Sequence, residues 1–372
     1  MKREYLVGTT IPIVSPETRC SSFGRSRKNF ELMHRAGLRI VRAFCGYPFA
    51  DAEKQIQQEA YKDFKAVAEL YAQNGIETMG TVTNDSQYMV DNTGAVSCVI
   101  HAPEWMGSPE EERYYRQLFE CCKFMAQDNA ERVRYWQIGN ENDTDVFRGR
   151  LDPEQNIRWL LTAARGIKAG NPQAKCITNL AGLDKLGQPG KTHSVHPAAA
   201  EMLERTFCIE NSPFDIIGLD AYFGSWMPGR PEYWHQYIDD AHRVTGKPVL
   251  ISEWGYSTMQ RGEPRPESDR NRHFNSDVCR WKDWDAPGME KWMGKDHTEE
   301  LQAEYIRHCV KIFAENEHCI GDLFFQWQDQ ERCWQCGEPD CPSECAWGCI
   351  RTDGTPKPGF YALMEEYNRY FG

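Results

Sequence analysis

The sequence lacks long apolar runs, and no stretch of it approaches the roughly 20 residues that a helix needs to cross a bilayer. It also lacks the features of a signal peptide, because the basic residues near its start are followed by neither a continuous apolar segment nor a small-residue cleavage site. These absences predict a cytoplasmic protein with neither an export signal nor a membrane partner.

An excess of positive charge is also missing. The 372 residues carry 43 Lys and Arg against 55 Asp and Glu, which gives a formal net charge of −12. A protein that binds nucleic acid needs a clustered basic surface to contact the phosphates. The composition therefore argues against a nucleic-acid partner and favours a neutral substrate, while it leaves the oligomeric state open.

No Ser-rich, Pro-rich or low-complexity linker divides the chain. Short apolar runs instead alternate with amphipathic stretches, as in repeated strand-then-helix units. The candidate strands are 5–10, 38–44, 76–82, 133–138, 175–180, 216–219, 248–252 and 320–325. The candidate helices include 55–74, 110–128, 153–170, 231–245, 299–316 and 359–370. Gly37, Gly75, Gly170 and Gly246 are predicted to end helices in the left-handed conformation.

These units predict an α/β fold, a (β/α)8 TIM barrel that forms one domain over residues 1–372. The active site of such a barrel lies at the C-terminal ends of its strands. Two segments are expected to extend this face. They are a long connection after the seventh strand, 256–298, and a Cys-rich insertion after the eighth strand, 333–349.

Two glutamates follow candidate strands of the barrel directly. Glu141 comes after the fourth strand and Glu253 after the seventh. A carboxylate at the end of a buried strand is costly to desolvate unless it faces a polar cleft. One such glutamate alone is readily explained as a rim ion pair or a helix-start carboxylate, but a matching pair favours a catalytic mouth.

The Cys-rich insertion holds five of the fifteen cysteines. Cys333, Cys336, Cys341 and Cys345, with Cys349 within reach, have a spacing typical of a structural zinc site with four thiolates. Disulfides and unligated thiols remain alternatives. The other cysteines are scattered through candidate helices and strands, which fits a reducing cytoplasm.

The chain resembles the clan A glycoside hydrolases, retaining barrel enzymes that include cellulases and β-galactosidases. The resemblance rests on Asn140-Glu141, Glu253, Trp327 and the tail 347–358, and it does not single out one family. It implies that Glu141 is the acid/base and Glu253 the nucleophile in hydrolysis of β-glycosidic bonds of neutral oligosaccharides or glycosides, without a cofactor for catalysis. Cleavage with retention itself requires two carboxyl groups about 5–5.5 Å apart.

Three further residues are expected beside this pair. Arg42, on the second strand, where the clan commonly has an arginine, is suited to keep Glu253 ionised. Asn140 is suited to bind a sugar 2-hydroxyl, or else to form a turn beside Gly139. Tyr222 follows the sixth strand and either donates to Glu253, as in similar clan members, or is a half-buried cap of the barrel.

Other polar and aromatic residues are weaker candidates for substrate binding. Trp327 is either a stacking platform or a core residue, and Trp254 adjoins the predicted nucleophile. Asn84 and Asp85 either reach sugar hydroxyls or form a plain turn. Asp220 is interpreted as a rim acid or a sugar ligand.

The connection 256–298 carries Trp281, Trp284 and Trp292 among balanced charges, which favours a lid for a neutral sugar. A metal-dependent barrel hydrolase is disfavoured because the first strand, 5–10, has no His-x-His motif. A catalytically inactive carbohydrate-binding barrel and a transglycosidase remain alternatives. The sequence does not determine the sugar or whether cleavage is endo or exo.

Overall fold

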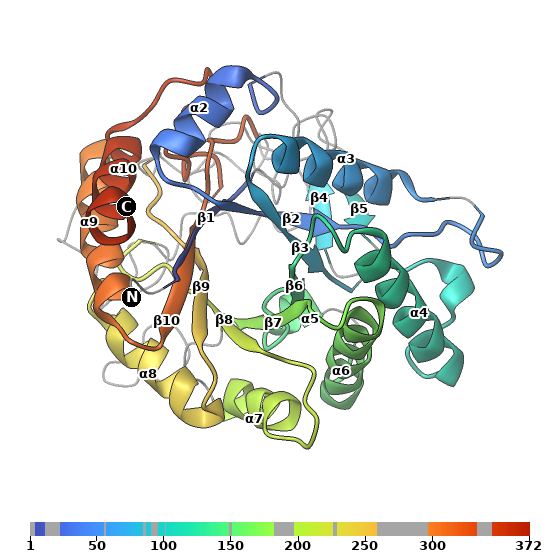
Figure 1. Ribbon diagram of the computed structural model, residues 1–372. Coiled ribbons are helices and arrows are strands. Elements are labelled where there is room, and N and C mark those ends of the chain that lie inside the picture. Colours follow the sequence, from blue (N-terminus) through green and yellow to red (C-terminus); the bar gives the residue numbers. More distant parts are fainter. Residues whose placement is uncertain are drawn as a thin grey trace, which may run out of the picture.

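The computed structural model describes residues 4–11, 23–55, 57–84, 87–90, 96–100, 102–148, 151–181, 197–225, 229–258, 297–332 and 344–372. Within them, eight parallel strands close into a barrel that is surrounded by helices, which confirms the predicted fold (Figure 1). The barrel strands are β1 (Leu6–Thr10), β2 (Ile40–Cys45), β3 (Glu77–Val82), β6 (Tyr135–Ile138), β7 (Lys175–Leu180), β8 (Ile216–Asp220), β9 (Val249–Trp254) and β10 (Cys319–Phe324).

The strands pair in chain order, and β1 closes the barrel by pairing with β10. Val7 lies opposite Asp322 on one side of β1, and Thr10 lies opposite Arg42 on the other. Because every barrel pair is parallel, all eight C-terminal ends lie on one face, where the two glutamates were predicted to meet.

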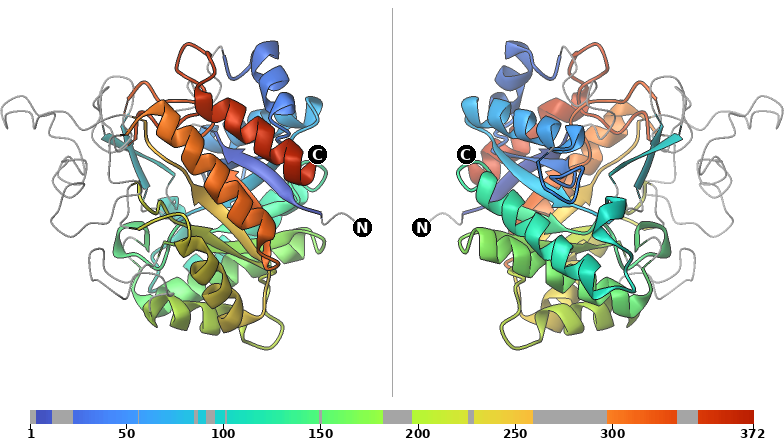
Figure 2. Two further views of the ribbon diagram at one scale, coloured as in Figure 1. Left: turned by 90° about the vertical axis from the view of Figure 1, so that its left-hand side faces the viewer. Right: turned by 90° about the vertical axis from the view of Figure 1, so that its right-hand side faces the viewer.

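Amphipathic helices cover the outside of the barrel. They are α2 (Arg27–Arg35), α3 (Glu59–Gln73), α4 (Glu112–Asp128), α6 (Pro153–Gly170), α7 (Pro197–Phe207), α8 (Tyr233–Thr245), α9 (Glu299–Glu315) and α10 (Pro358–Phe371). Of these, α9 and α10 lie side by side, and the two ends of the chain lie on one side of the barrel (Figure 2). Side-chain hydrogen bonds cap the N-termini of several helices. At α6, for example, Asp152 and Gln155 form a capping box.

The helix ends agree with the predicted glycine caps at three positions of four. Gly37, Gly75 and Gly246 have φ of +77°, +69° and +69°, a conformation that suits glycine. Gly170 was predicted wrongly, because it is the last residue of α6 and Asn171 is the cap. A Cβ at Gly170 would lie 2.1 Å from the backbone oxygen of Lys123 on α4, so close helix packing is the reason for glycine there.

Four short elements were not among the candidate segments. Strands β4 (Gln87–Val90) and β5 (Val96–Ile100) pair antiparallel outside the barrel sheet. The other two are the 3-10 helix η1 (Glu104–Met106) and the single-turn helix α5 (Asp145–Arg148). Such short segments carry too few residues to show a periodicity of their own. No helix among the described residues is long and apolar enough to cross a membrane.

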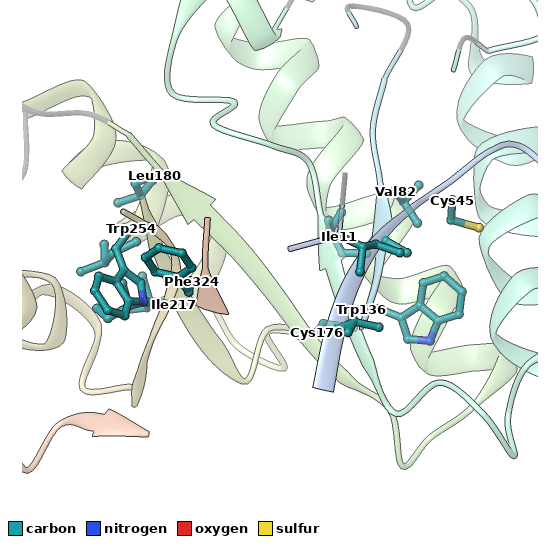
Figure 3. Close-up of a cluster of buried hydrophobic side chains, with 14 of the residues drawn as sticks. Ile11, Cys45, Val82, Trp136, Cys176, Leu180, Ile217, Trp254 and Phe324 are labelled. Atoms are coloured by element: carbon teal, nitrogen blue, oxygen red, sulfur yellow. The ribbon is translucent and has the colours of Figure 1, made fainter. Parts of the chain in front are cut away.

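The apolar core has two layers. The larger one lies between strands and helices, and Figure 3 shows part of it, with Trp254 and Phe324 on one side and Trp136, Val82 and Cys45 on the other. The smaller one fills the barrel interior with Ile40, Met79, Tyr135, Ile177, Ile216, Leu250 and Leu323. This inner layer makes the barrel a packed core rather than a pore.

The barrel interior becomes polar in the next layer of inward-facing side chains toward the C-terminal face. Side chains alternate along a strand, so the residue two positions after an inward-facing one also faces inward. At these positions the sequence has Arg42, Thr81, Gln137, Asn179 and Ser252, all with 0% exposure. Asp220, at the end of β8, has the same burial. This polar layer forms the floor beneath the two glutamates.

Asp322 on β10 is a second buried acid, and it faces the helices rather than the barrel interior. Its carboxylate accepts hydrogen bonds from Tyr5 Oη (2.8 Å), Trp254 Nε1 (2.9 Å) and Tyr367 Oη. Burial raises its pKa to about 7, although these donors oppose the rise. As the pH rises, Asp322 in the folded protein therefore keeps its proton to a higher pH than it does in the unfolded chain, where its pKa is about 3.9.

We expect Asp322 to make the protein less stable as the pH rises. The stabilisation that comes from this bound proton is complete below about pH 4 and is lost as the pH rises through about 7. The free energy of unfolding of wild type should fall relative to that of Asp322→Asn by up to about 1.4 kcal/mol per pH unit in this window. Urea unfolding of both proteins at several pH values measures the difference, and parallel curves would contradict the prediction.

The matched control is Asp353→Asn. Asp353 lies before α10, and the hydrogen bonds that it accepts from Thr355 lower rather than raise its pKa. This variant should retain the wild-type loss of stability toward neutral pH.

Candidate active site

Glu141 lies in a tight turn after β6. The turn uses left-handed backbone at Gly139 (φ +80°) and at Glu141 itself (φ +49°). A positive φ is unfavourable for a residue with a side chain and persists where surrounding contacts enforce it. Here the Glu141 amide donates to Asn179 Oδ1 (2.9 Å), and the Glu141 carbonyl accepts from the Thr144 amide (2.9 Å). The strained residue is thus held in place from both sides.

The side chains of Asn142 and Asn156 also support this turn. The Asn140 amide donates to Asn142 Oδ1 (2.9 Å), and Asn142 Nδ2 donates to Asn156 Oδ1 on α6 (2.8 Å). Asn140, Asn142 and Asn156 are all buried. The turn that carries Glu141 is therefore anchored to a helix as well as to the neighbouring strand.

Glu253 faces the acidic cluster because the pairing of β8 with β9 shifts register between Leu219 and Asp220, so that Asp220 pairs with Glu253. In a regular strand, Ser252 and Glu253 would face opposite sides. At the irregularity both reach inward, because Ser252 Oγ donates to Asp220 and Glu253 accepts from Arg42. Local irregularities of this kind re-aim side chains next to active sites.

The Glu253 carboxylate is fixed at both oxygens. Arg42 Nη1 donates to Oε1, and Tyr222 Oη donates to Oε2. The Arg42 guanidinium is itself held by Thr81 Oγ1 (3.2 Å) and by Asn140 Oδ1. Arg42 therefore connects the nucleophile candidate to the turn that carries Glu141.

Glu141, Asp220 and Glu253 form one cluster, with a carboxylate oxygen from each within 4.8 Å of the others. Desolvation raises the pKa of Glu141 well above its usual range, and the charges of Asp220 and Glu253 raise it further. Burial likewise raises the pKa of Asp220. Although clustered carboxylates can hold a hard cation, Arg42 already neutralises Glu253, so the arrangement suits proton transfer better than metal binding.

Three aromatic rings pack together beside the glutamates. The Tyr222 ring lies 4.8 Å from Trp347 and 5.9 Å from Phe325, and Trp347 lies 6.0 Å from Phe325, measured between ring centroids. Trp347, at the start of the tail that carries the resemblance, and Phe325 were not predicted to lie at the site. No local pattern identifies them, because they approach Tyr222 only when the segment after β10 folds back across the face.

The structure thus brings together five of the predicted site residues: Glu141, Glu253, Arg42, Asn140 and Tyr222. The sequence reasoning missed Asn179 and Ser252, and it left Asp220 undecided. Alternation along each strand could have identified Asn179, since it lies two residues after Ile177 of the inner apolar layer.

The two predicted tryptophans lie elsewhere. Trp327 is 2% exposed, donates through Nε1 to Asn29 Oδ1 on α2 (2.6 Å) and packs against Phe360 of α10. Trp254 is fully buried between barrel and helices, where its Nε1 donates to Asp322. Neither indole has an exposed face on which a sugar could stack, because the outward-facing side of the strands is covered by helices.

The remaining predicted residues form no part of the cluster. Asn84 is buried and donates to the Arg148 carbonyl (2.5 Å), which ties the segment after β3 to that after β6. Asp85 and the three tryptophans of the connection 256–298 lie outside the described residues. So do Cys333, Cys336 and Cys341, whereas Cys345 and Cys349 are buried. The zinc site stays a prediction.

No protein-family model and no curated protein matches the sequence. Solved structures do match in fold. A GH53 catalytic domain from Ignisphaera aggregans is 17% identical, with a TM-score of 0.61 over 97% of this chain and 95% of that one. A family 1 β-glucosidase from Thermotoga maritima is 13% identical, with a TM-score of 0.62 and complete coverage of both chains.

A GH2 β-galacturonidase from Eisenbergiella tayi is 14% identical, with a TM-score of 0.59. It is covered over 52% of its own length, so the present chain spans about half of that protein. The matches confirm the resemblance to clan A barrels at the level of fold, and they assign no single family.

Proposed function

We propose that this protein is a retaining glycoside hydrolase that cleaves β-glycosidic bonds of neutral oligosaccharides or glycosides. The observation that carries the proposal is the pair Glu141 and Glu253, which have one carboxylate oxygen each within 4.8 Å of the other, in unlike surroundings. Retaining pairs are about 5–5.5 Å apart, whereas inverting pairs leave ~6.5–9.5 Å for a water molecule. The short separation supports retention.

The surroundings divide the two roles. Glu253 accepts from Arg42 and Tyr222, which orient its carboxylate for attack on the anomeric carbon. Glu141, with its raised pKa, retains a proton to give to the departing oxygen. In the second half of the reaction the ionised Glu141 takes a proton from water, and the water oxygen attacks the anomeric carbon and releases Glu253.

Asn140 is placed to recognise the sugar. Its Oδ1 accepts from Arg42 Nη2, Gln137 Nε2 and Asn179 Nδ2. This leaves the Nδ2 group of Asn140 as a donor for a sugar 2-hydroxyl, a contact that strengthens as positive charge develops on the ring.

The charge of the cluster supports a neutral sugar. Three carboxyl groups meet there, and Arg42, which binds the carboxylate of Glu253, is already shared between Glu253 and Asn140. A sugar carboxylate would add a fourth acidic group to a buried site, which is electrostatically unfavourable. A β-linkage is supported by the names of two similar structures, a β-glucosidase and a β-galacturonidase.

Covalent trapping tests the proposal directly. The protein is incubated with 2-deoxy-2-fluoro β-glycosides of the gluco, galacto, manno and xylo series, and with a glucuronide for contrast. Mass spectrometry then measures the mass of the intact protein. We expect a glycosyl adduct with a neutral donor, mapped by peptide sequencing to Glu253. An adduct on another residue would overturn the assignment of the nucleophile.

The trapping result also separates the alternatives. Steady turnover without any adduct would support an inverting reaction, and failure to turn over any donor would support an inactive carbohydrate-binding barrel. Product analysis in the presence of added alcohol distinguishes hydrolysis from transglycosylation, because a transglycosidase forms an alkyl glycoside in preference to free sugar.

A further inference from the structure

Asp220 is the third carboxyl of the cluster, and the double-displacement reaction assigns it no role. It is the last residue of β8 and has 0% exposure. Its Oδ2 accepts from Asn179 Nδ2 (2.5 Å) on β7, and its Oδ1 accepts from Ser252 Oγ (2.5 Å) on β9. Bonds to both flanking strands fix this carboxylate more firmly than packing alone would.

Asp220 is also hydrogen-bonded to Glu141. Two carboxyl groups can form such a bond only when one of them carries a proton. Burial raises the pKa of both groups, but the hydrogen bond between them and the donors on Asp220 oppose this rise at Asp220, whereas the same bond raises the pKa of Glu141, so we assign the proton of the pair to Glu141. Glu141 is therefore the donor and Asp220 the acceptor.

One asparagine sets the relative position of both groups. Asn179 accepts from the backbone amide of Glu141 through Oδ1 (2.9 Å) and donates to Asp220 through Nδ2. Asn179 thus binds both the backbone of Glu141 and the carboxylate of Asp220, which accepts a hydrogen bond from the Glu141 carboxyl. This connection restricts the directions in which the Glu141 carboxyl can turn.

Asp220 differs from Glu253 in what happens to its charge during the reaction. Glu253 loses its charge when it bonds to the sugar, whereas Asp220 forms no bond to the sugar in either half-reaction. After desolvation, the charge of Asp220 is also the largest influence that raises the pKa of Glu141, ahead of Glu253. Asp220 would therefore keep Glu141 basic enough to take a proton from water in the second step.

We propose that Asp220 is a positioning residue that holds the carboxyl of Glu141 and its proton in place for transfer to the leaving group. This inference rests on the proposed function, since it assigns Asp220 a part in that reaction. It acts through Glu141 and needs no contact with the sugar.

The test is the Asp220→Asn variant, which keeps the size of the side chain and removes its charge. The alkaline limb of the pH profile of kcat/KM should move to lower pH by about one unit, because Glu141 loses a negative neighbour. Hydrolysis of alkyl β-glycosides, which need a proton on the leaving oxygen, should slow by about 10–100-fold. The kcat/KM for 2,4-dinitrophenyl β-glycosides, whose leaving group needs no proton, should change by less than about threefold.

The matched control is Asp322→Asn, another buried aspartate on a barrel strand, which contacts Tyr5, Trp254 and Tyr367 instead of the cluster. Its pH profile and leaving-group dependence should match wild type. Equal losses on both substrate classes with an unmoved alkaline limb in Asp220→Asn would overturn the proposal, because a merely structural role predicts that result.

A second measurement does not depend on activity. The carboxyl stretching band of Glu141, identified by its loss in Glu141→Gln, is followed by infrared spectroscopy against pH in wild type and in Asp220→Asn. We expect its midpoint to fall by about one pH unit in the variant. An unchanged or higher midpoint would overturn the proposal.

The two readouts separate this proposal from the proposed function. If wild type cleaves no β-glycoside, the proposed function fails and Asp220 has no reaction to serve, so the proposal falls with it. The infrared midpoint would in that case still report whether Asp220 governs the proton of Glu141. If wild type is active and the midpoint does not move, the present proposal alone fails.

Discussion

The Glu253→Ala variant should hydrolyse aryl β-glycosides on the order of 10⁵-fold more slowly than wild type. The carboxylate supplies the bond that replaces the departing group, and its hydrogen-bond partners, Arg42 and Tyr222, offer no carboxylate in its place. Values of kcat/KM with 2,4-dinitrophenyl β-glycosides measure the loss, since this leaving group needs no proton and kcat/KM reports the attack on the sugar.

Loss of Glu253 also leaves Arg42 buried without its ionic partner, which costs stability. Glu253→Gln is the companion variant, because its amide oxygen can still accept from Arg42, while its NH2 group takes the place of the oxygen that binds Tyr222. Both should be inactive while Glu253→Gln unfolds closer to the wild-type temperature. Glu366→Gln on α10, whose partner is Arg369, is the matched control for removing a mostly buried glutamate and should keep full activity.

Azide adds a stereochemical check on Glu253→Ala. A small anion that enters the space left by the carboxylate attacks the same face of the sugar as Glu253 would. It should therefore restore turnover and give an α-glycosyl azide, of configuration opposite to the substrate. A β-glycosyl azide from this variant would show that Glu253 is not the nucleophile.

Replacement of Glu141 by alanine should have the second largest effect and a different pattern. Hydrolysis of alkyl β-glycosides should fall by about 10²–10⁴-fold, because the leaving oxygen receives no proton. Attack on a 2,4-dinitrophenyl glycoside needs no such proton, so the glycosyl-enzyme should form quickly and then accumulate. A pre-steady-state burst of dinitrophenol measures this directly.

Azide again identifies the role. In Glu141→Ala it intercepts the glycosyl-enzyme from the face opposite Glu253, and the product should be a β-glycosyl azide. The pH profile gives a further criterion, because the alkaline limb of wild type reports the raised pKa of Glu141 and should disappear in this variant. An equal loss for both classes of leaving group would contradict the acid/base assignment.

The sequence predicted the fold from its pattern. Alternating strands and helices set the order of the barrel, and the position of Glu141 and Glu253 just after two such strands placed them on one face. These features are readable because strand and helix periodicity, and the common direction of parallel strands, are local or follow from topology. Arg42, on the second strand, and Tyr222, after the sixth, were found from their place on the barrel together with the resemblance to clan A enzymes.

Other features depended on contacts between distant segments. The tryptophans show this: Trp327 and Trp254 have the residue type expected of a sugar platform, but burial against α2, α10 and the helix layer decides which way they face. Trp347 reaches Tyr222 from 125 positions further along the chain, and no local pattern predicts that contact.

The sequence by itself therefore determined the barrel, the acidic pair and the residues at the strand ends, because each follows from the pattern along one segment. Only the tertiary structure decided how charge and protons are shared among them. The irregular pairing of β8 with β9 turns Glu253 inward, and Asn179 joins Asp220 to the turn of Glu141. Desolvation and the spacing of carboxylates on different strands exist only once the barrel has closed.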